Sequence, residues 1–150
     1  MKSSEVSSDL VFVGSRVSSF NLTTNKINKK GQPVDVSFDY DYNIQELQHE
    51  GSNSFGVIEF IVHIKATVKK KVLFKLDLVM EGAFKSESLD EAMFKQMVEL
   101  NGLVTLSQMS RSYIQSVTAQ SGINPPVKMP LIDINRLIEL KNKDKETSGH

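Results

Sequence analysis

Apolar and polar residues alternate through the middle of the chain, in two stretches separated by Lys69–Lys71. Every second residue is apolar between Phe55 and Thr67, and the same spacing recurs between Val72 and Glu81. Because side chains alternate between the two faces of a β-strand, this pattern predicts a hairpin with one covered face and one face in water. The residues predicted to share the covered face are Ile58, Phe60, Val62, Ile64, Ala66, Phe74, Leu76, Leu78 and Met80.

Two further strands are predicted upstream of this hairpin. The stretch 10–23 keeps a period of two as far as Ser18-Ser19, where the apolar residues change parity, and this predicts a β-bulge or a bend in an edge strand. Residues 34–44 show the clearest alternation in the chain and predict a half-buried strand. The segments 24–33 and 45–54 contain turn residues, so both are predicted to be loops, the first a solvated hairpin loop.

Helical signals follow the last strand. The run Ser88-Leu89-Asp90-Glu91 is a capping-box pattern, which predicts a helix over residues 89–100. Asn101-Gly102 interrupts the pattern, so we expect a kink or a short break there, before a second helical run over 103–120. Three prolines make residues 123–130 an extended connection, and a last helix capped by Asp133 follows.

The chain length is that of one domain with a single core. Residues 1–8 are small, polar and aperiodic, and we expect them to be disordered. The charged segment 144–150 is predicted to be a disordered tail. The folded domain is therefore expected to cover residues 9–143.

The second helical run carries almost no charge. From Leu100 to Val127 the one charged residue is Arg111, whereas a surface helix with one buried face should have a charged back. We therefore expect this helix to pack on the chain's own sheet on one side and on a second subunit on the other. The predicted interface residues are Leu103, Leu106, Ser110, Tyr113 and Val117.

Composition narrows the functional classes. Eighteen basic and eighteen acidic residues give zero net charge, which argues against nucleic acid as the main partner. There are no cysteines and no apolar stretch of about 18 residues, so we expect a cytoplasmic protein that does not insert into a membrane. The three histidines lack metal-ligand spacing and no phosphate-binding loop is present, so the sequence predicts no metal, no cofactor and no enzymatic activity.

Three aspartates share the polar face of the strand 34–44: Asp35, Asp39 and Asp41. Because consecutive strand residues lie about 3.4 Å apart, these carboxylates are too widely spaced for a metal site. A solvated acidic strip explains them, and docking of a basic partner is the alternative.

Several motifs resemble the SecB family of protein-export chaperones. They are V-H-I-K-A-T at 62–67, G-A-F at 82–84, the uncharged helix with Arg111, and P-L-I-D-I-N-R-L-I at 130–138, in the order in which the family has its counterparts. The run F-D-Y-D at 38–41 is also similar to a motif on the family's second strand. The resemblance implies an α+β fold: a four-stranded antiparallel sheet covered on one face by a long kinked helix, plus a short C-terminal helix, assembled as a homotetramer.

The function that this resemblance implies is that of an ATP-independent holdase, which binds unfolded polypeptides for export or protects a specific client such as an antitoxin. Asp39, Asp41 and Asp77 are the candidates for docking to the SecA motor. Two alternatives remain open, a module that binds a small apolar ligand and a purely structural oligomer. The candidates for an apolar client groove, between the end of the fourth strand, the proline-rich connection and the last helix, are Val79, Phe84, Met129, Leu137 and Ile138.

Overall fold

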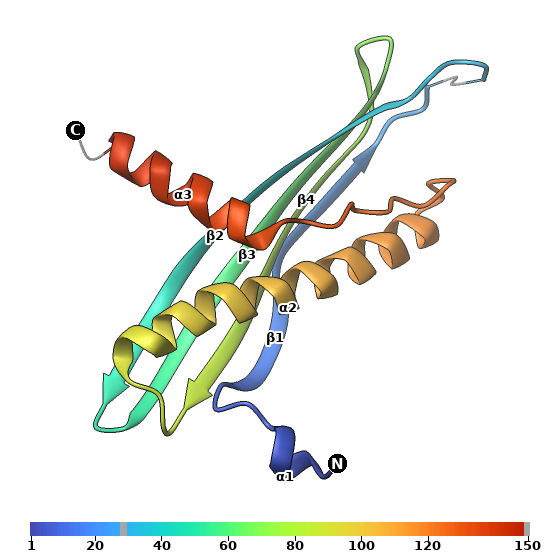
Figure 1. Cartoon of the computed structure of the whole chain (residues 1–150). Helices are drawn as coiled ribbons and strands as arrows, with labels where there is room; N and C mark the ends of the chain where they lie inside the picture. The colour runs from blue at the N-terminus through green and yellow to red at the C-terminus, as the bar shows by residue number, and fades with distance from the viewer. Residues whose placement is uncertain (28–29, 149–150) are drawn as a thin grey trace.

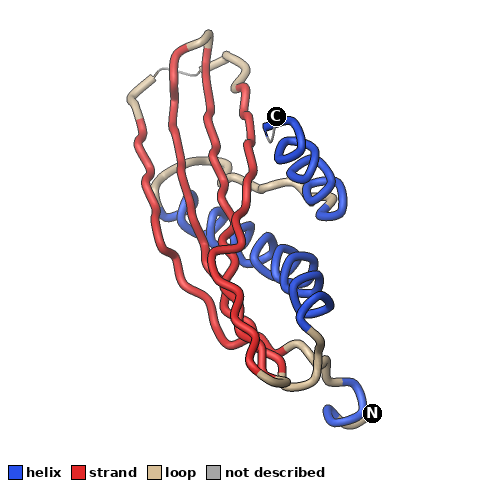
Figure 2. Tube along the Cα trace, turned by 90° about the vertical axis from the view of Figure 1, so that its left-hand side faces the viewer, coloured by secondary structure: helices blue, strands red, loops and turns tan. Residues whose placement is uncertain are grey.

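A computed structural model describes residues 1–27 and 30–148 of the chain. Four long strands form one antiparallel sheet in the order β1-β4-β3-β2, and both long helices lie on the same side of it (Figures 1 and 2). The α+β class and the four-stranded sheet predicted from the sequence are confirmed. The elements are α1 (Ser3–Val6), β1 (Val11–Thr24), β2 (Asp35–Glu50), β3 (Asn53–Val68), β4 (Lys71–Ser86), α2 (Glu91–Gln120) and α3 (Ile134–Ser148).

The hairpin of β3 and β4 is the centre of the sheet, as predicted. The two strands pair along their whole length, and the turn between them consists of Lys69 and Lys70, which both have positive φ angles, 49° and 67°. All nine apolar residues predicted to share the covered face are at most 4% exposed. The alternating pattern therefore identified the core face of both central strands.

The connection between β1 and β2 differs from the prediction. The segment 24–33 was expected to close a hairpin, but β1 pairs with β4 and β2 pairs with β3, so the two strands lie at opposite edges of the sheet. Local turn chemistry cannot distinguish a hairpin loop from a segment that crosses the end of a sheet. The predicted bulge in β1 is confirmed, because its register with β4 shifts between Val17 and Ser19.

The predicted loop 45–54 is wrong over most of its length. β2 continues to Glu50, β3 begins at Asn53, and only the turn around Gly51 separates them. The register with β3 shifts between Ile44 and Glu46. This bulge changes the parity of the side chains, so the alternation that predicted the strand is lost from the sequence although the strand itself goes on.

α2 is one helix of 30 residues, without the break expected at Asn101-Gly102. Gly102 is buried at the sheet, where an added Cβ atom would lie 3.0 Å from Ile58 Cγ2 and 3.3 Å from Phe84 Cε2. This glycine thus permits close approach of helix and sheet and does not end the helix. The N-cap is Asp90 rather than Ser88, since Asp90 Oδ1 accepts a hydrogen bond from the Met93 N–H at 2.8 Å.

The termini contain more helix than the sequence predicted. Ser3–Val6 forms a short helix within the segment 1–8, and α3 extends to Ser148 through most of the segment 144–150. The last two residues of that segment lie outside the described part of the chain.

Candidate binding groove

An apolar groove of about 390 Å³ lies on the inner face of the sheet, the face that carries the helices. Its first wall is the start of β2, its floor is the start of β4, and its second wall is the proline-rich connection between α2 and α3. The residues that line it are Val34, Val36, Phe38, Leu73, Phe74, Ile123, Asn124, Pro125, Pro126, Val127 and Lys128.

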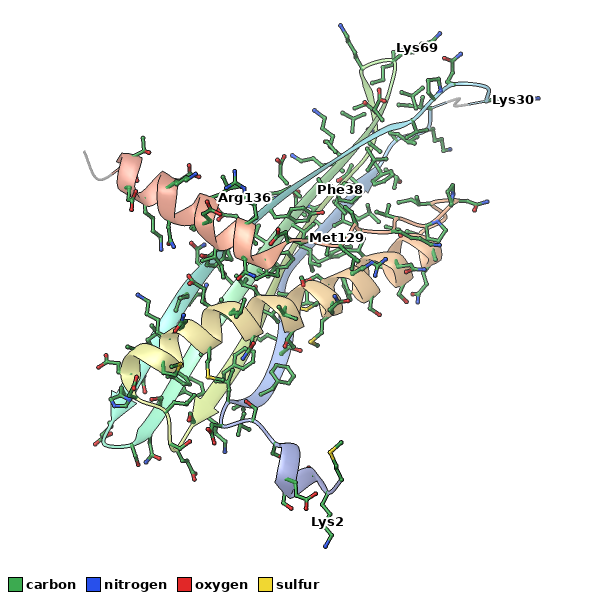
Figure 3. The ribbon with its side chains drawn as sticks, viewed as in Figure 1. Lys2, Lys30, Phe38, Lys69, Met129 and Arg136 are labelled. Carbon is green, nitrogen blue, oxygen red and sulfur yellow. The ribbon has the colours of Figure 1, made fainter. Side chains whose placement is uncertain are left out.

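Two hydrogen bonds from α2 hold the proline-rich wall in place. The backbone N–H of Val127 donates to the buried hydroxyl of Thr118 at 2.9 Å, and that hydroxyl donates to the carbonyl of Ile114 at 2.7 Å. Arg111 Nε donates to the carbonyl oxygen of Met129 at 2.8 Å. Figure 3 shows Met129 on this connection and Phe38 on the sheet. Arg111 therefore links α2 to the proline-rich connection within the chain.

Stacked aromatic rings continue the groove along the sheet. The ring centroids of Phe38 and Tyr40 are 6.4 Å apart, and those of Tyr40 and Phe60 are 6.0 Å apart. The buried Tyr40 hydroxyl has no hydrogen-bond partner among the described residues, and its burial raises the pKa of Tyr40. Only Phe38 of this row lines the groove itself.

α3 closes the far end of this row through polar contacts. Lys141 Nζ lies 2.7 Å from Asp41 Oδ1 and 5.7 Å from the centre of the Tyr42 ring. The Tyr42 hydroxyl donates to Glu99 Oε2 of α2 at 2.9 Å. Burial, followed by this hydrogen bond to Glu99, raises the pKa of Tyr42. Burial alone would raise the pKa of Asp41, but the hydrogen bond and charge of Lys141 lower it below its ordinary value.

The five residues predicted for the groove are not brought together. Phe84 and Met129 are 2% and 1% exposed and belong to the core, whereas Leu137 and Ile138 are half-buried on α3. Val79 lies on the outer face of the sheet, opposite Ile61 on β3. The sequence reasoning missed the lining residues at the start of β2, although Val34 and Val36 stood in the alternating pattern.

The predicted interface residues of α2 face this chain's own sheet. Leu103, Leu106 and Ser110 are fully buried in the core. Tyr113 and Val117 are partly buried, and the Tyr113 ring contacts Phe20 of β1 edge-on, with 5.5 Å between the centroids. In the second half of the helix, the opposite side is exposed and carries no charge besides the half-buried Arg111. The exposed residues on this uncharged helix face are Val104, Gln108, Ser112, Gln115, Ser116 and Ala119.

Two of the three aspartates that are candidates for SecA docking have partners within the chain. Asp41 is paired with Lys141, and Asp77 Oδ1 lies 2.6 Å from Nδ1 of His63. Asp39 is exposed and makes no ion pair with any residue in the described ranges.

Two other kinds of site are missing from the described part of the chain. Over residues 1–27 and 30–148, no group of three or more histidine, aspartate or glutamate side chains is arranged to hold a metal ion. No helix in those ranges is both long and apolar enough to cross a membrane.

The same architecture occurs in two solved structures. The chain is similar to the SecB-like chaperone Rv1957 of Mycobacterium tuberculosis, in complex with a ChAD peptide from the HigA1 antitoxin Rv1956. The TM-score is 0.62 with 14% sequence identity, and the match covers 83% of this chain and 91% of that chain. A protein of unknown function from Streptococcus agalactiae matches with a TM-score of 0.51 and 13% identity, over 81% of this chain and 97% of that one.

In sequence, no protein-family model matches the chain, and neither does any curated protein. The likeness is therefore one of fold: this chain is folded like a SecB-like chaperone.

Proposed function

We propose that this protein is an ATP-independent holdase chaperone, which binds apolar segments of unfolded polypeptides in the groove beside β2. The observation that carries the proposal is the exposure of the groove wall. Val34 and Val36 are 39% and 43% exposed, although their side chains point to the face of the sheet that is covered elsewhere. An extended client that covers these residues gains about 25 cal/mol for each Å² of apolar surface removed from water.

The chemistry of the groove supports broad specificity. Its walls offer mainly aliphatic, proline and aromatic side chains, so the buried area rather than a pattern of hydrogen bonds would determine the affinity. Unfolded chains share exposed apolar side chains whatever their sequence. A groove of this kind therefore suits a protein that keeps many unfolded clients from aggregating.

The structural neighbour suggests one class of client. The Mycobacterium tuberculosis chaperone of the same fold was solved with a peptide from an antitoxin, and an antitoxin segment is accordingly a candidate client here. Delivery to SecA has less support, because two of its three docking candidates, Asp41 and Asp77, are already paired with Lys141 and His63.

A module for a small apolar ligand fits the groove less well. Such ligands are commonly enclosed over most of their surface, whereas Val34 and Val36 leave one wall of this groove open to solvent. A chain that enters and leaves along the strand needs that opening. The open wall of the groove therefore favours an extended polypeptide over an enclosed small molecule as its ligand.

Assembly into a homotetramer is part of the proposal. The uncharged helix face of α2, defined above from Val104 to Ala119, is exposed in the single chain. A solvated helix usually carries charges on its exposed side. A second copy packed against this face would explain why such charges are missing from it. The predicted interface residues Leu103 and Leu106 would not take part, because they are buried in the chain's own core.

Two neighbouring substitutions test the groove directly. Val36→Asp places a carboxylate in the groove wall, and the control Ser37→Asp places the same charge one residue further, on the outer face of the exposed start of β2. We expect Val36→Asp to weaken binding of a fluorescently labelled apolar peptide at least tenfold and Ser37→Asp to leave it within about twofold. Equal affinities for both variants would contradict the assignment of the groove.

A further inference from the structure

Lysines of two separate loops gather at one end of the molecule. The turn between β3 and β4 contributes Lys69 and Lys70, and Lys71 is the first residue of β4. The connection between β1 and β2 contributes Lys26 and Lys30. Figures 1 and 3 show the two loops at the same end, and Figure 3 labels Lys30 and Lys69. We call these residues the lysine pole. The zero net charge of the chain conceals this concentration of positive charge.

The lysine pole surrounds a hollow of about 410 Å³ between the two loops. No acidic residue in the described part of the chain lines this hollow, and Lys26, Lys69 and Lys71 make no ion pair with a described residue. The charges of Lys26, Lys69 and Lys71 are therefore uncompensated within those ranges. The lining residues are Lys26, Ile27, Lys30, Gln32, Val68, Lys69 and Lys71.

The hairpin turn carries its lysines in an unfavourable backbone conformation. Lys69 and Lys70 have φ angles of 49° and 67°, and two-residue hairpin turns of this kind favour asparagine and glycine at both positions. Asparagine and glycine adopt these φ angles at a lower cost in free energy than lysine does. Charged side chains at these positions are consistent with a role for the charge itself.

The hollow continues the apolar groove along the same face of the sheet. Val68 lines the base of the hollow and lies two residues beyond Ala66, on the inner face of β3. Ala66 is in turn paired with Phe74, which lies on the floor of the groove. On the other wall, Gln32 in the hollow is two residues from Val34 in the groove. Because strand residues advance by about 3.4 Å, one extended peptide of about eight residues spans both sites.

We infer that the lysine pole binds an acidic stretch adjoining the apolar segment of a client, so that the protein prefers clients in which an apolar segment is followed or preceded by aspartate and glutamate. This inference rests on the proposed function, since it names the class of client for the same groove. Lysine ammonium groups attract carboxylates, and Gln32 in the wall of the hollow supplies a polar side chain.

A nucleic acid fits the same charges less well. Proteins that bind single strands combine cationic side chains with aromatic rings on which bases stack, and the described lining of the hollow includes no aromatic residue and no arginine. The recess between two loops also suits one extended chain better than a duplex.

The test compares three synthetic peptides with the same apolar core and a neutral, an acidic or a basic flank. Fluorescence anisotropy is measured on the wild-type protein, on Lys69→Asn with Lys71→Gln, and on the control Lys65→Gln with Lys75→Gln. The control removes an equal charge from the outer face, where Lys65 and Lys75 are exposed cross-strand neighbours. Asparagine suits the positive φ of residue 69, so the first variant should keep its hairpin.

We expect the acidic flank to bind the wild type and the control about tenfold more tightly than the neutral flank. This advantage should disappear in the lysine-pole variant and decrease with salt, while the neutral peptide binds all three proteins alike. If the neutral peptide binds but the acidic flank adds nothing, the lysine-pole inference is wrong and the groove stands. If no peptide binds, both are wrong. If the acidic peptide binds but an equally charged oligothymidine displaces it, the pole is reassigned to nucleic acid.

Discussion

One hydroxyl group, that of Thr118, joins α2 to the wall of the groove. It is fully buried, donates to the Ile114 carbonyl and accepts the N–H of Val127. A valine at this position would keep the shape of the side chain but would leave the Val127 N–H without its partner. The groove wall therefore depends on a polar contact in an otherwise apolar interior.

Thr118→Val should destabilise the protein by about 1–3 kcal/mol, because a buried N–H loses its hydrogen bond. Thr118→Ser retains the hydroxyl and loses one methyl group, so it should cost about 1 kcal/mol. Denaturant unfolding of both variants measures the difference. A valine variant that is more stable than the serine variant would show that the hydrogen bond does not hold the wall.

Gly102 allows α2 to lie close to the sheet. Gly102→Val should lower the free energy of unfolding by about 1–3 kcal/mol, since the added atoms meet the buried side chains of Ile58 and Phe84. Asn101→Ala changes the exposed residue next to it and should have an effect within about 0.5 kcal/mol. Thermal unfolding of the two variants separates close packing from helix propensity, which alone would favour replacing the glycine.

Residue-level features of this kind were largely beyond sequence reasoning. The sequence shows that residue 102 is glycine, and helix propensity alone interprets glycine as an interruption. Only the position of Ile58 and Phe84 across the interface reveals that the missing side chain makes room for the sheet. In the same way, nothing local indicates that Thr118 serves a backbone group nine residues further along.

At the scale of elements, α3 is less firmly attached than α2. Ile134 is its one buried residue in the described range, and Lys141 links it to β2 through Asp41 and the ring of Tyr42. Because Lys141 is charged and Asp41 is half-exposed, this link is sensitive to salt and to protonation. The helix should therefore open locally more readily than α2.

Lys141→Met should increase hydrogen exchange throughout α3 and leave α2 unchanged. Lys143→Met is the matched control, because Lys143 pairs with Glu139 of the same helix at 3.7 Å and does not reach the sheet. Hydrogen exchange followed by mass spectrometry provides the measurement. Equal exchange in the two variants would mean that the contact of Lys141 with Asp41 does not anchor the helix.

The same link has a pH dependence with a defined sign. The pKa of Asp41 is lowered in the folded chain, so its contribution to stability is present above the ordinary carboxyl pKa of about 3.9 and is lost as the pH falls through the lower folded value. Exchange of α3, corrected for intrinsic rates, should therefore accelerate below about pH 4 in the wild type. Asp41→Asn should abolish this acceleration, and its persistence would exclude Asp41 as the cause.

Element prediction succeeded where a single periodicity extended over many residues. The alternation in β3 and β4 identified strands, turn and core face, because both strands are regular and face the same helix. It failed after residue 44, where a bulge changes the parity, and between β1 and β2, where a connection crosses the sheet. The groove was located only approximately, because Val36 and Pro126 come together through the tertiary fold.

At the scale of the whole molecule, the uncharged helix face of α2 leads to a prediction about assembly. Sedimentation of the wild type at micromolar concentration should show a species several times larger than the 16.8 kDa chain. Val104, which is 44% exposed, tolerates a charge in the single chain, but Val104→Glu would bury that charge without a partner in the assembly. This variant should dissociate, whereas Asn135→Glu on exposed α3 should not. A wild type that sediments only as the single chain would contradict the assembly.

The most direct test of the holdase proposal is light scattering from a denatured client diluted into buffer without ATP. An excess of the wild-type protein should suppress aggregation of several unrelated clients and of a candidate antitoxin. Ser37→Asp should suppress it equally, and Val36→Asp, checked for its fold by circular dichroism, should suppress it much less. If aggregation of every client proceeds at the same rate with and without the wild-type protein, the chain is not a holdase.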